Sequence, residues 1–280
     1  MVRIITDSAA DFSPRELEQL NVTCIPLRVT CGEREYEENI DLNKDEFYAL
    51  LQSGAMPKTS QASPQALEDL FTIAHEAGDE AIYLCLSSAL SGTYQTAVMT
   101  QRMLGYEGTY VVDSRNATGG QRLLVEYASR LRDEGHSARQ IVSAVEALRE
   151  RIVLYACIDT LEYLYLGGRI SHTAYQLGSL AQIKPIISVD AEGRVIVPAK
   201  AVGMRRGMDT LCKRAAARPA DPAFPFYAMY TDDISVAQTL AKRLESVTGP
   251  IPAQHIIQVG AAIGSHIGPA ACGFVYVAAE

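Results

Sequence analysis

A short turn rich in hydroxyl side chains follows an apolar run in the first half of the sequence. Residues 81–86 are mostly apolar and predict a buried strand, and the next helix is expected to begin near Tyr94. In the turn between them, the hydroxyls of Ser88, Ser91 and Thr93 add hydrogen-bond donors, and Gly92 lets a ligand approach the backbone closely. The free N–H groups of a first helical turn carry positive partial charge. The turn is therefore suited to binding an anion.

This turn contains no side chain that could activate a hydroxyl, because His, Asp, Glu, Lys and Cys are absent from it. The pattern therefore indicates an anion-binding turn and not a nucleophile. A capped strand-to-helix turn without any ligand is the alternative interpretation. A second hydroxyl segment, Thr59 and Ser60, precedes Ser63 and Pro64, which have the residue types of a helix N-cap and first helical position. Ordinary turn chemistry is again the alternative.

His266 lies in the glycine-rich segment 260–273, which the sequence predicts to be a loop between the last two strands. It is the segment's only titratable side chain apart from the thiol of Cys272. A lone histidine is usually structural, but a glycine-rich loop offers a side chain little to pack against. We therefore expect His266 to be a polar functional residue.

Composition excludes several classes of function. The 25 basic residues against 33 acidic ones give a net charge of −8, which argues against a general nucleic-acid partner. The six cysteines are dispersed, as expected of reduced thiols in a cytoplasmic protein, and no cluster of residues indicates a metal site. No apolar run is long enough for a membrane span, and the first residues do not resemble a signal peptide. Nucleotide-binding glycine motifs and a G-x-S-x-G elbow are also absent.

The order of the expected elements indicates an α/β protein with two domains. In residues 1–158, strands alternate with helices, which predicts a mostly parallel sheet flanked by helices; one of its strands is expected at 22–29. Residues 159–280 contain a hairpin and fewer crossovers, which predicts an α+β domain with a largely antiparallel sheet. A further helix is expected from Ser171 to just before Lys184. Ligands of parallel sheets bind beyond the carboxyl ends of the strands, where the hydroxyl-rich turns lie.

Six ordered motifs resemble those of the DegV family, and the resemblance covers essentially the whole chain. They are Thr6-Asp7-Ser8, Lys58-Thr59-Ser60-Gln61, Leu86 to Thr93, Val112-Asp113-Ser114, Leu166-Gly167-Gly168-Arg169-Ile170 and Gly264-Ser265-His266-Ile267-Gly268-Pro269. The resemblance implies a long-chain fatty acid bound between the two domains, no cofactor and no catalytic residue. It further implies a non-enzymatic carrier that presents the acyl carboxylate to a separate ATP-dependent fatty acid kinase subunit. The carrier would then take the acyl phosphate towards phospholipid synthesis.

The resemblance also implies roles for individual residues. The expected carboxylate-binding residues are Thr59, Ser60, Ser91, Gly92, Thr93 and His266. The expected contacts to the kinase partner or to phosphate are Arg169, Arg205 and Arg206. The sequence departs mildly from the common family pattern at Ser265 and Ala270. The competing hypothesis is a transferase or kinase that acts on a small acidic metabolite with His266 as its base.

Overall fold

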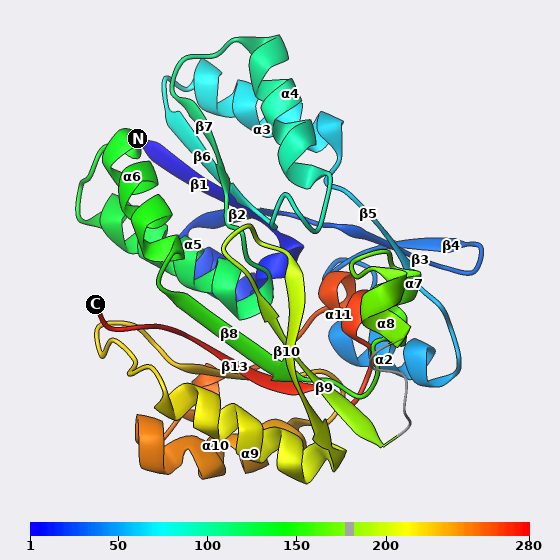
Figure 1. The fold of residues 1–280 in the computed structure, drawn as a ribbon. Coiled ribbons are helices and arrows are strands. Elements are labelled where there is room, and N and C mark those ends of the chain that lie inside the picture. The colour runs from blue at the N-terminus through cyan, green and yellow to red at the C-terminus, as the bar shows by residue number, and fades with distance from the viewer. Residues whose placement is uncertain (177–181) are drawn as a thin grey trace.

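The computed structural model describes residues 1–176 and 182–280, which form two large sheets with helices on their faces (Figure 1). Helix α5 (Thr118–Asp133) lies between the sheets and contacts strands of both. The outer faces are covered by α3 (Pro64–Glu76) and α4 (Thr93–Leu104) on the first sheet. On the second sheet they are covered by α9 (Gly203–Ala216) and α10 (Ile234–Thr248). The two outer helix pairs are therefore at opposite ends of a layered molecule.

The first sheet has four parallel strands in the order β2-β1-β6-β7. They are β2 (Val22–Ile25), β1 (Val2–Asp7), β6 (Glu80–Cys85) and β7 (Thr109–Asp113). Helix α1 (Pro14–Leu20) begins with the expected capping box, in which Ser13 and Glu16 bond each other's backbone N–H. Helix α6 (Ala138–Arg149) packs beside α5 on the inner face. A mostly parallel sheet flanked by helices is confirmed for this part of the chain.

The second sheet is mixed and mostly antiparallel, with the order β10-β9-β8-β13-β11-β12. Its strands are β8 (Ile152–Cys157), β9 (Ile183–Val189), β10 (Val195–Val202), β11 (Tyr227–Tyr230), β12 (Ile256–Gln258) and β13 (Cys272–Val277). Because β8 pairs only with strands of this sheet, it belongs with the second half of the chain, although the sequence analysis grouped it with the first. The division at residue 158 stays a prediction, and the pairing favours a boundary before Ile152.

A smaller antiparallel sheet and several short helices complete the structure. The sheet has the order β4-β3-β5, formed by β3 (Arg28–Cys31), β4 (Arg34–Glu37) and β5 (Lys58–Ser60). The helices beside it are α2 (Lys44–Gln52), α7 (Glu162–Leu166), α8 (His172–Gln176) and α11 (Ala261–Ile267). Figure 1 shows α11 and α7 close to this sheet, at one side of the two large sheets. This arrangement brings β5 and α11 together.

Two sequence-based expectations differ from the structure, and a third falls partly outside the described residues. The strand expected at 22–29 is two strands, because Pro26 lacks an N–H group for a continuous ladder. The prediction of a loop at 260–273 was wrong for residues 261–267, which form helix α11 with His266 in its last turn. Of the helix expected to run from Ser171 towards Lys184, the described part is α8, and residues 177–181 lie outside the described residues.

Candidate functional site

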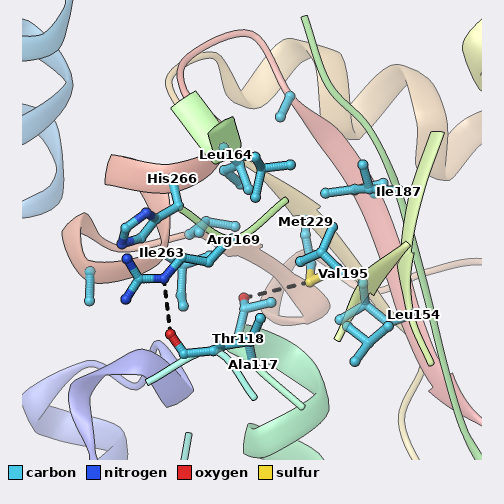
Figure 2. Close-up of a pocket in the computed structure, with 18 of the residues that line it drawn as sticks. Ala117, Thr118, Leu154, Leu164, Arg169, Ile187, Val195, Met229, Ile263 and His266 are labelled. Carbon is cyan, nitrogen blue, oxygen red and sulfur yellow. Dashed lines mark hydrogen bonds between the residues drawn. The ribbon is translucent and has the colours of Figure 1, made fainter. Parts of the chain in front are cut away.

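A cavity lies next to α11, between the second sheet and the segments that follow the strands of the first sheet. Its volume is about 90 Å³ when measured as the space open to the centre of a water molecule. Most of its walls are apolar side chains of the second sheet, among them Leu154, Ala156, Ile187, Val195 and Met229. Leu86, which directly follows β6 of the first sheet, adds to them. Figure 2 shows His266 and Arg169 at one end and Leu154 at the other. The cavity is thus a slot with one polar end.

The polar end brings together residues that are distant in the sequence. Thr59 and Ser60 of β5, Ser91 before α4, and His266 of α11 all line the cavity. Thr59 Oγ1 and His266 Nε2 lie 2.8 Å apart and form a hydrogen bond. Arg169 also lines this end. Five of the nine residues that the sequence singled out therefore line the cavity.

The hydroxyl of Ser91 is oriented by its neighbour Thr93. Thr93 Oγ1 accepts a hydrogen bond from the backbone N–H of Ala62 at 3.1 Å and lies 2.9 Å from Ser91 Oγ. Ser91 Oγ also accepts from the N–H of Thr93 at 3.2 Å. If Thr93 donates its hydroxyl proton to Ser91, the proton of Ser91 is free for a ligand in the cavity. Thr93 itself is fully buried and does not line the cavity, so it positions the site.

The buried ring of His266 is neutral near neutral pH. Burial and, to a smaller extent, the nearby positive charge of Arg169 together lower the pKa of His266 to about 4. Among the described residues, no group forms a hydrogen bond with His266 Nδ1, and this atom faces Gly167, where a Cβ would collide with it. A buried N–H without an acceptor is costlier than a buried lone pair, which favours the proton on Nε2. His266 then donates to Thr59, whose own hydroxyl proton is left for a ligand.

Arg169 closes the polar end on its outer side. Its Nε donates to the carbonyl of Leu90 at 3.0 Å, and its Nη1 donates to the carbonyl of Gly167 (Figure 2 shows the first bond). Burial lowers the pKa of the guanidinium from its ordinary value, but an arginine stays charged. Arg169 also lines an open groove on the far side, together with Ser88, Arg194 and other residues. It therefore lies between the cavity and this groove.

The other predicted residues lie elsewhere. Gly92 is the N-cap of α4 and does not line the cavity. Arg205 and Arg206 are exposed on α9, the helix on the outer face of the second sheet. Ser8 and Ser114, which end two of the six family motifs, are buried and do not line the cavity. Ser8 Oγ donates to Glu38, and Ser114 Oγ donates to the carbonyl of Asn116.

Sequence reasoning missed a pair of buried carboxyl groups that position α11. Asp11 accepts from the N–H of Gly260 at 2.7 Å, and Glu38 accepts from the N–H of Ala262 at 3.0 Å. These bonds hold the first turn of the helix whose last turn carries His266. Burial and the proximity of Asp11 raise the pKa of Glu38 to about 7. No local sequence motif indicates this pair, because Asp11 and Glu38 are more than 220 positions from their partners at the start of α11.

Residues 1–176 and 182–280 contain no group of three His, Cys, Asp or Glu side chains placed to hold a metal ion. Within the same described ranges, no helix has both the length and the apolar character needed to cross a membrane.

Comparison with known proteins identifies the family. The model of the DegV family, described as "Uncharacterised protein, DegV family", matches residues 1–279. The chain belongs to the DegV family. A DegV domain-containing protein of Caldanaerobacter subterraneus is 32% identical over 279 residues, which cover 98% of each chain. A DegV domain-containing protein of Clostridium perfringens is 34% identical over 274 residues, covering 95% of this chain and 93% of that one.

Solved DegV structures share this fold. A fatty-acid-binding DegV family protein from Thermus thermophilus has a TM-score of 0.88 and 28% identity, with 99% of each chain covered. DegV of Bacillus subtilis, a fatty acid binding protein, has a TM-score of 0.82 and 25% identity, also with 99% of each chain covered. The expected architecture of a parallel sheet with helices and a second, mostly antiparallel sheet is that of these DegV structures.

Proposed function

We propose that this DegV protein binds a long-chain fatty acid in the cavity next to α11. The carboxylate would lie at the polar end, beside Thr59, Ser60, Ser91 and His266, and the alkyl chain would follow the apolar walls. The observation that carries this proposal is the lining of the cavity, which is mostly apolar and has hydroxyl groups and a neutral histidine at one end. The solved relatives that bind fatty acids support it.

The apolar part of the slot accounts for affinity. Burying about 14 methylene groups at about 0.8 kcal/mol each gives roughly 11 kcal/mol as an upper bound, before the cost of ordering the chain. Most residues that line the cavity are apolar, and its hydroxyl-bearing and charged residues include Thr59, Ser91 and Arg169. This lining favours a ligand with a long apolar chain over a small polar metabolite.

The polar end accounts for the orientation of the ligand. A buried carboxylate must be fully hydrogen-bonded, or its desolvation cancels the gain from the tail. With Thr93 donating to Ser91 and His266 donating to Thr59, one donor proton is left on each of Thr59 and Ser91, and both residues line the cavity. Arg169 adds a positive charge beside this end without needing to contact the carboxylate. A carboxylate satisfies all of these groups at once.

We further propose that the protein is a carrier for a separate ATP-dependent fatty acid kinase subunit and not an enzyme. The resemblance of its motifs to the family implies this role, and the sequence lacks a nucleotide-binding glycine motif. A pKa of about 4 makes His266 a weak base near neutral pH, which disfavours the alternative of a transferase or kinase with His266 as its base. The bound acyl phosphate would then leave towards phospholipid synthesis, in the cytoplasm.

A comparison of two ligands tests the binding proposal. Delipidated protein is titrated by calorimetry with a saturated fatty acid and with the primary alcohol of the same chain length. The acid is expected to bind about 10-fold or more tightly than the alcohol, because only the carboxylate accepts charge-assisted hydrogen bonds from the polar end. Equal affinities would contradict the assignment of the polar end to the carboxylate, and no binding of either ligand would contradict the proposed function.

A further inference from the structure

Two residues at the apolar end of the cavity also line a second cavity behind it. Leu154 of β8 and Val189 of β9 are shared by both. Figure 2 shows Leu154 on the side opposite His266 and Arg169. The second cavity has a volume of about 150 Å³ and is lined mainly by polar and charged residues: Arg115, Asn116, Arg149, Glu150 and Asp190. Leu154 and Val189 therefore form a wall between an apolar space and a polar one.

The position of this wall is fixed by the second sheet. Leu154 is 8% exposed and is paired with Val275 of β13. Its carbonyl accepts a hydrogen bond from Ser188 Oγ of β9 at 2.7 Å, which ties the backbone of β8 to the residue beside Val189. The two wall residues thus come from adjacent, hydrogen-bonded strands. Leu154 and Val189 therefore cannot move aside for a longer ligand without disturbing the pairing of β8 and β9.

The charged groups on the polar side of the wall make burial of an alkyl chain there unfavourable. Arg149 donates from Nη1 to the carbonyl of Asp113 at 2.6 Å, while its Nε is buried and makes no hydrogen bond with the described residues. This Nε lies 3.5 Å from Glu150 Oε1. Arg115 donates from Nη1 to Glu150 at 3.1 Å. A methyl group that entered this space would remove water from charged groups and offer them no acceptor.

We infer that Leu154 and Val189 set the maximum length of the acyl chain that this protein binds. This inference rests on the proposed function, since it requires the tail to run from the polar end to the wall. Each methylene buried ahead of the wall strengthens binding about fourfold. The gain ends at the chain whose methyl group reaches Leu154, and longer saturated chains bind more weakly.

A chain-length series tests the inference. Saturated straight-chain fatty acids of increasing length compete with a fluorescent fatty acid for delipidated wild type, Leu154→Ala and Ile187→Ala. In Leu154→Ala the chain length at which affinity stops rising is expected to increase by about two to three methylenes, the approximate volume of the side-chain atoms removed. Ile187 lines the first cavity but not the second, so Ile187→Ala is the matched control. It is expected to weaken binding while leaving the length limit unchanged.

Binding of an ω-hydroxy fatty acid is a second measurement. It distinguishes the opening of the wall from a general loosening of the protein core in the variant. Its terminal hydroxyl meets only Leu154 and Val189 in the wild type, and we expect it to bind at least 10-fold more weakly than the unsubstituted acid. In Leu154→Ala the hydroxyl can reach the polar cavity and accept from Arg149 Nε, so this penalty is expected to shrink several-fold. Ile187→Ala should keep the full penalty.

The outcomes are distinguishable. Val189→Ala, a smaller change in the same wall, replaces Leu154→Ala if the latter does not fold. An unchanged length limit and an unchanged ω-hydroxyl penalty in a folded wall variant would overturn the inference while leaving the proposed function intact. If the wild type binds no fatty acid of any length, the proposed function itself fails, and the inference fails with it.

Discussion

Thr59 Oγ1 and His266 Nε2 lie 2.8 Å apart although 207 positions separate them in the sequence. One belongs to the small sheet in the first half of the chain, and the other to the last turn of α11. Their hydrogen bond joins the two halves at the polar end of the cavity. Because the pKa of His266 is lowered, the imidazole stays neutral and can orient the threonine hydroxyl without placing a charge beside it.

Removing the hydroxyl of Ser91 tests the carboxylate site. Ser91→Ala is expected to weaken fatty acid binding by about 1–3 kcal/mol, because a buried carboxylate loses one donor. The matched control is Ser88→Ala, since Ser88 lies in the same turn but lines the outer groove and not the cavity. Titrations of both variants with the same fatty acid give the answer. Equal affinities for the two would place the carboxylate on other residues, with Thr59 and Ser60 the first to examine.

Arg205 and Arg206 test whether binding and partner contact are separate. Both are exposed on α9 and neither lines the cavity, so the double variant Arg205→Ala/Arg206→Ala is expected to keep its fatty acid affinity within about twofold. Acyl phosphate formation with ATP and a fatty acid kinase subunit is expected to fall, because planar guanidinium groups suit docking and phosphate contact.

Lys213→Ala, which removes an exposed charge from the same helix, is the control for this experiment. Wild-type turnover in the double variant would assign the two arginines to a solvated helix face. Loss of the lipid would instead assign them to the fold. Acyl phosphate formed by the protein with ATP alone would contradict the carrier role.

The buried histidine predicts a loss of stability in acid. The pKa of His266 is about 4 in the folded protein and about 6.5 when unfolded, so the unfolded state binds more protons between these values. The free energy of unfolding should therefore fall as the pH drops from about 6.5 to about 4, by up to about 3 kcal/mol from this group. Denaturant titrations of wild type and His266→Asn across this range measure the contribution. Identical pH dependence in the two proteins would contradict the burial of a neutral imidazole.

Glu38 predicts a contribution of opposite sign. Its pKa is about 7 in the folded protein, above the usual 4.5, so the folded state binds more protons between these values. The contribution of Glu38 to stability is therefore fully present below about pH 4.5 and is lost as the pH rises through about 7. In Glu38→Gln the side chain keeps an oxygen that can accept from the N–H of Ala262, but it does not titrate. The free energy of unfolding of this variant should therefore decline less over this pH range. An unchanged decline would assign the titration to another group.

Local motifs made the first half of the fold predictable. The capping box of Ser13 and Glu16 and the turn between β6 and α4 depend on residues a few positions apart. The hydroxyls at Thr59 and Ser91 could likewise be recognised as candidates because they follow strands or precede helices. What the sequence could not provide was their distance from each other and from His266.

The segment around α11 shows why the rest was not predictable. Its glycines favour a loop by propensity, yet the structure uses Gly264 for close packing, because a Cβ there would collide with Phe47 and Tyr48 of α2. The helix is also held by Asp11 and Glu38 from the other end of the chain. Tertiary contacts of this range override local propensity and leave no local signal.

Mass spectrometry of the ligand extracted from purified protein tests the central claim most directly. The protein is purified without added lipid, denatured and extracted, and the extract is quantified against the protein. We expect a long-chain fatty acid in roughly stoichiometric amount, since a mostly apolar cavity with a hydrogen-bonding end retains such a ligand through purification. A lipid-free extract from a folded protein that also fails to bind added fatty acids would contradict the account.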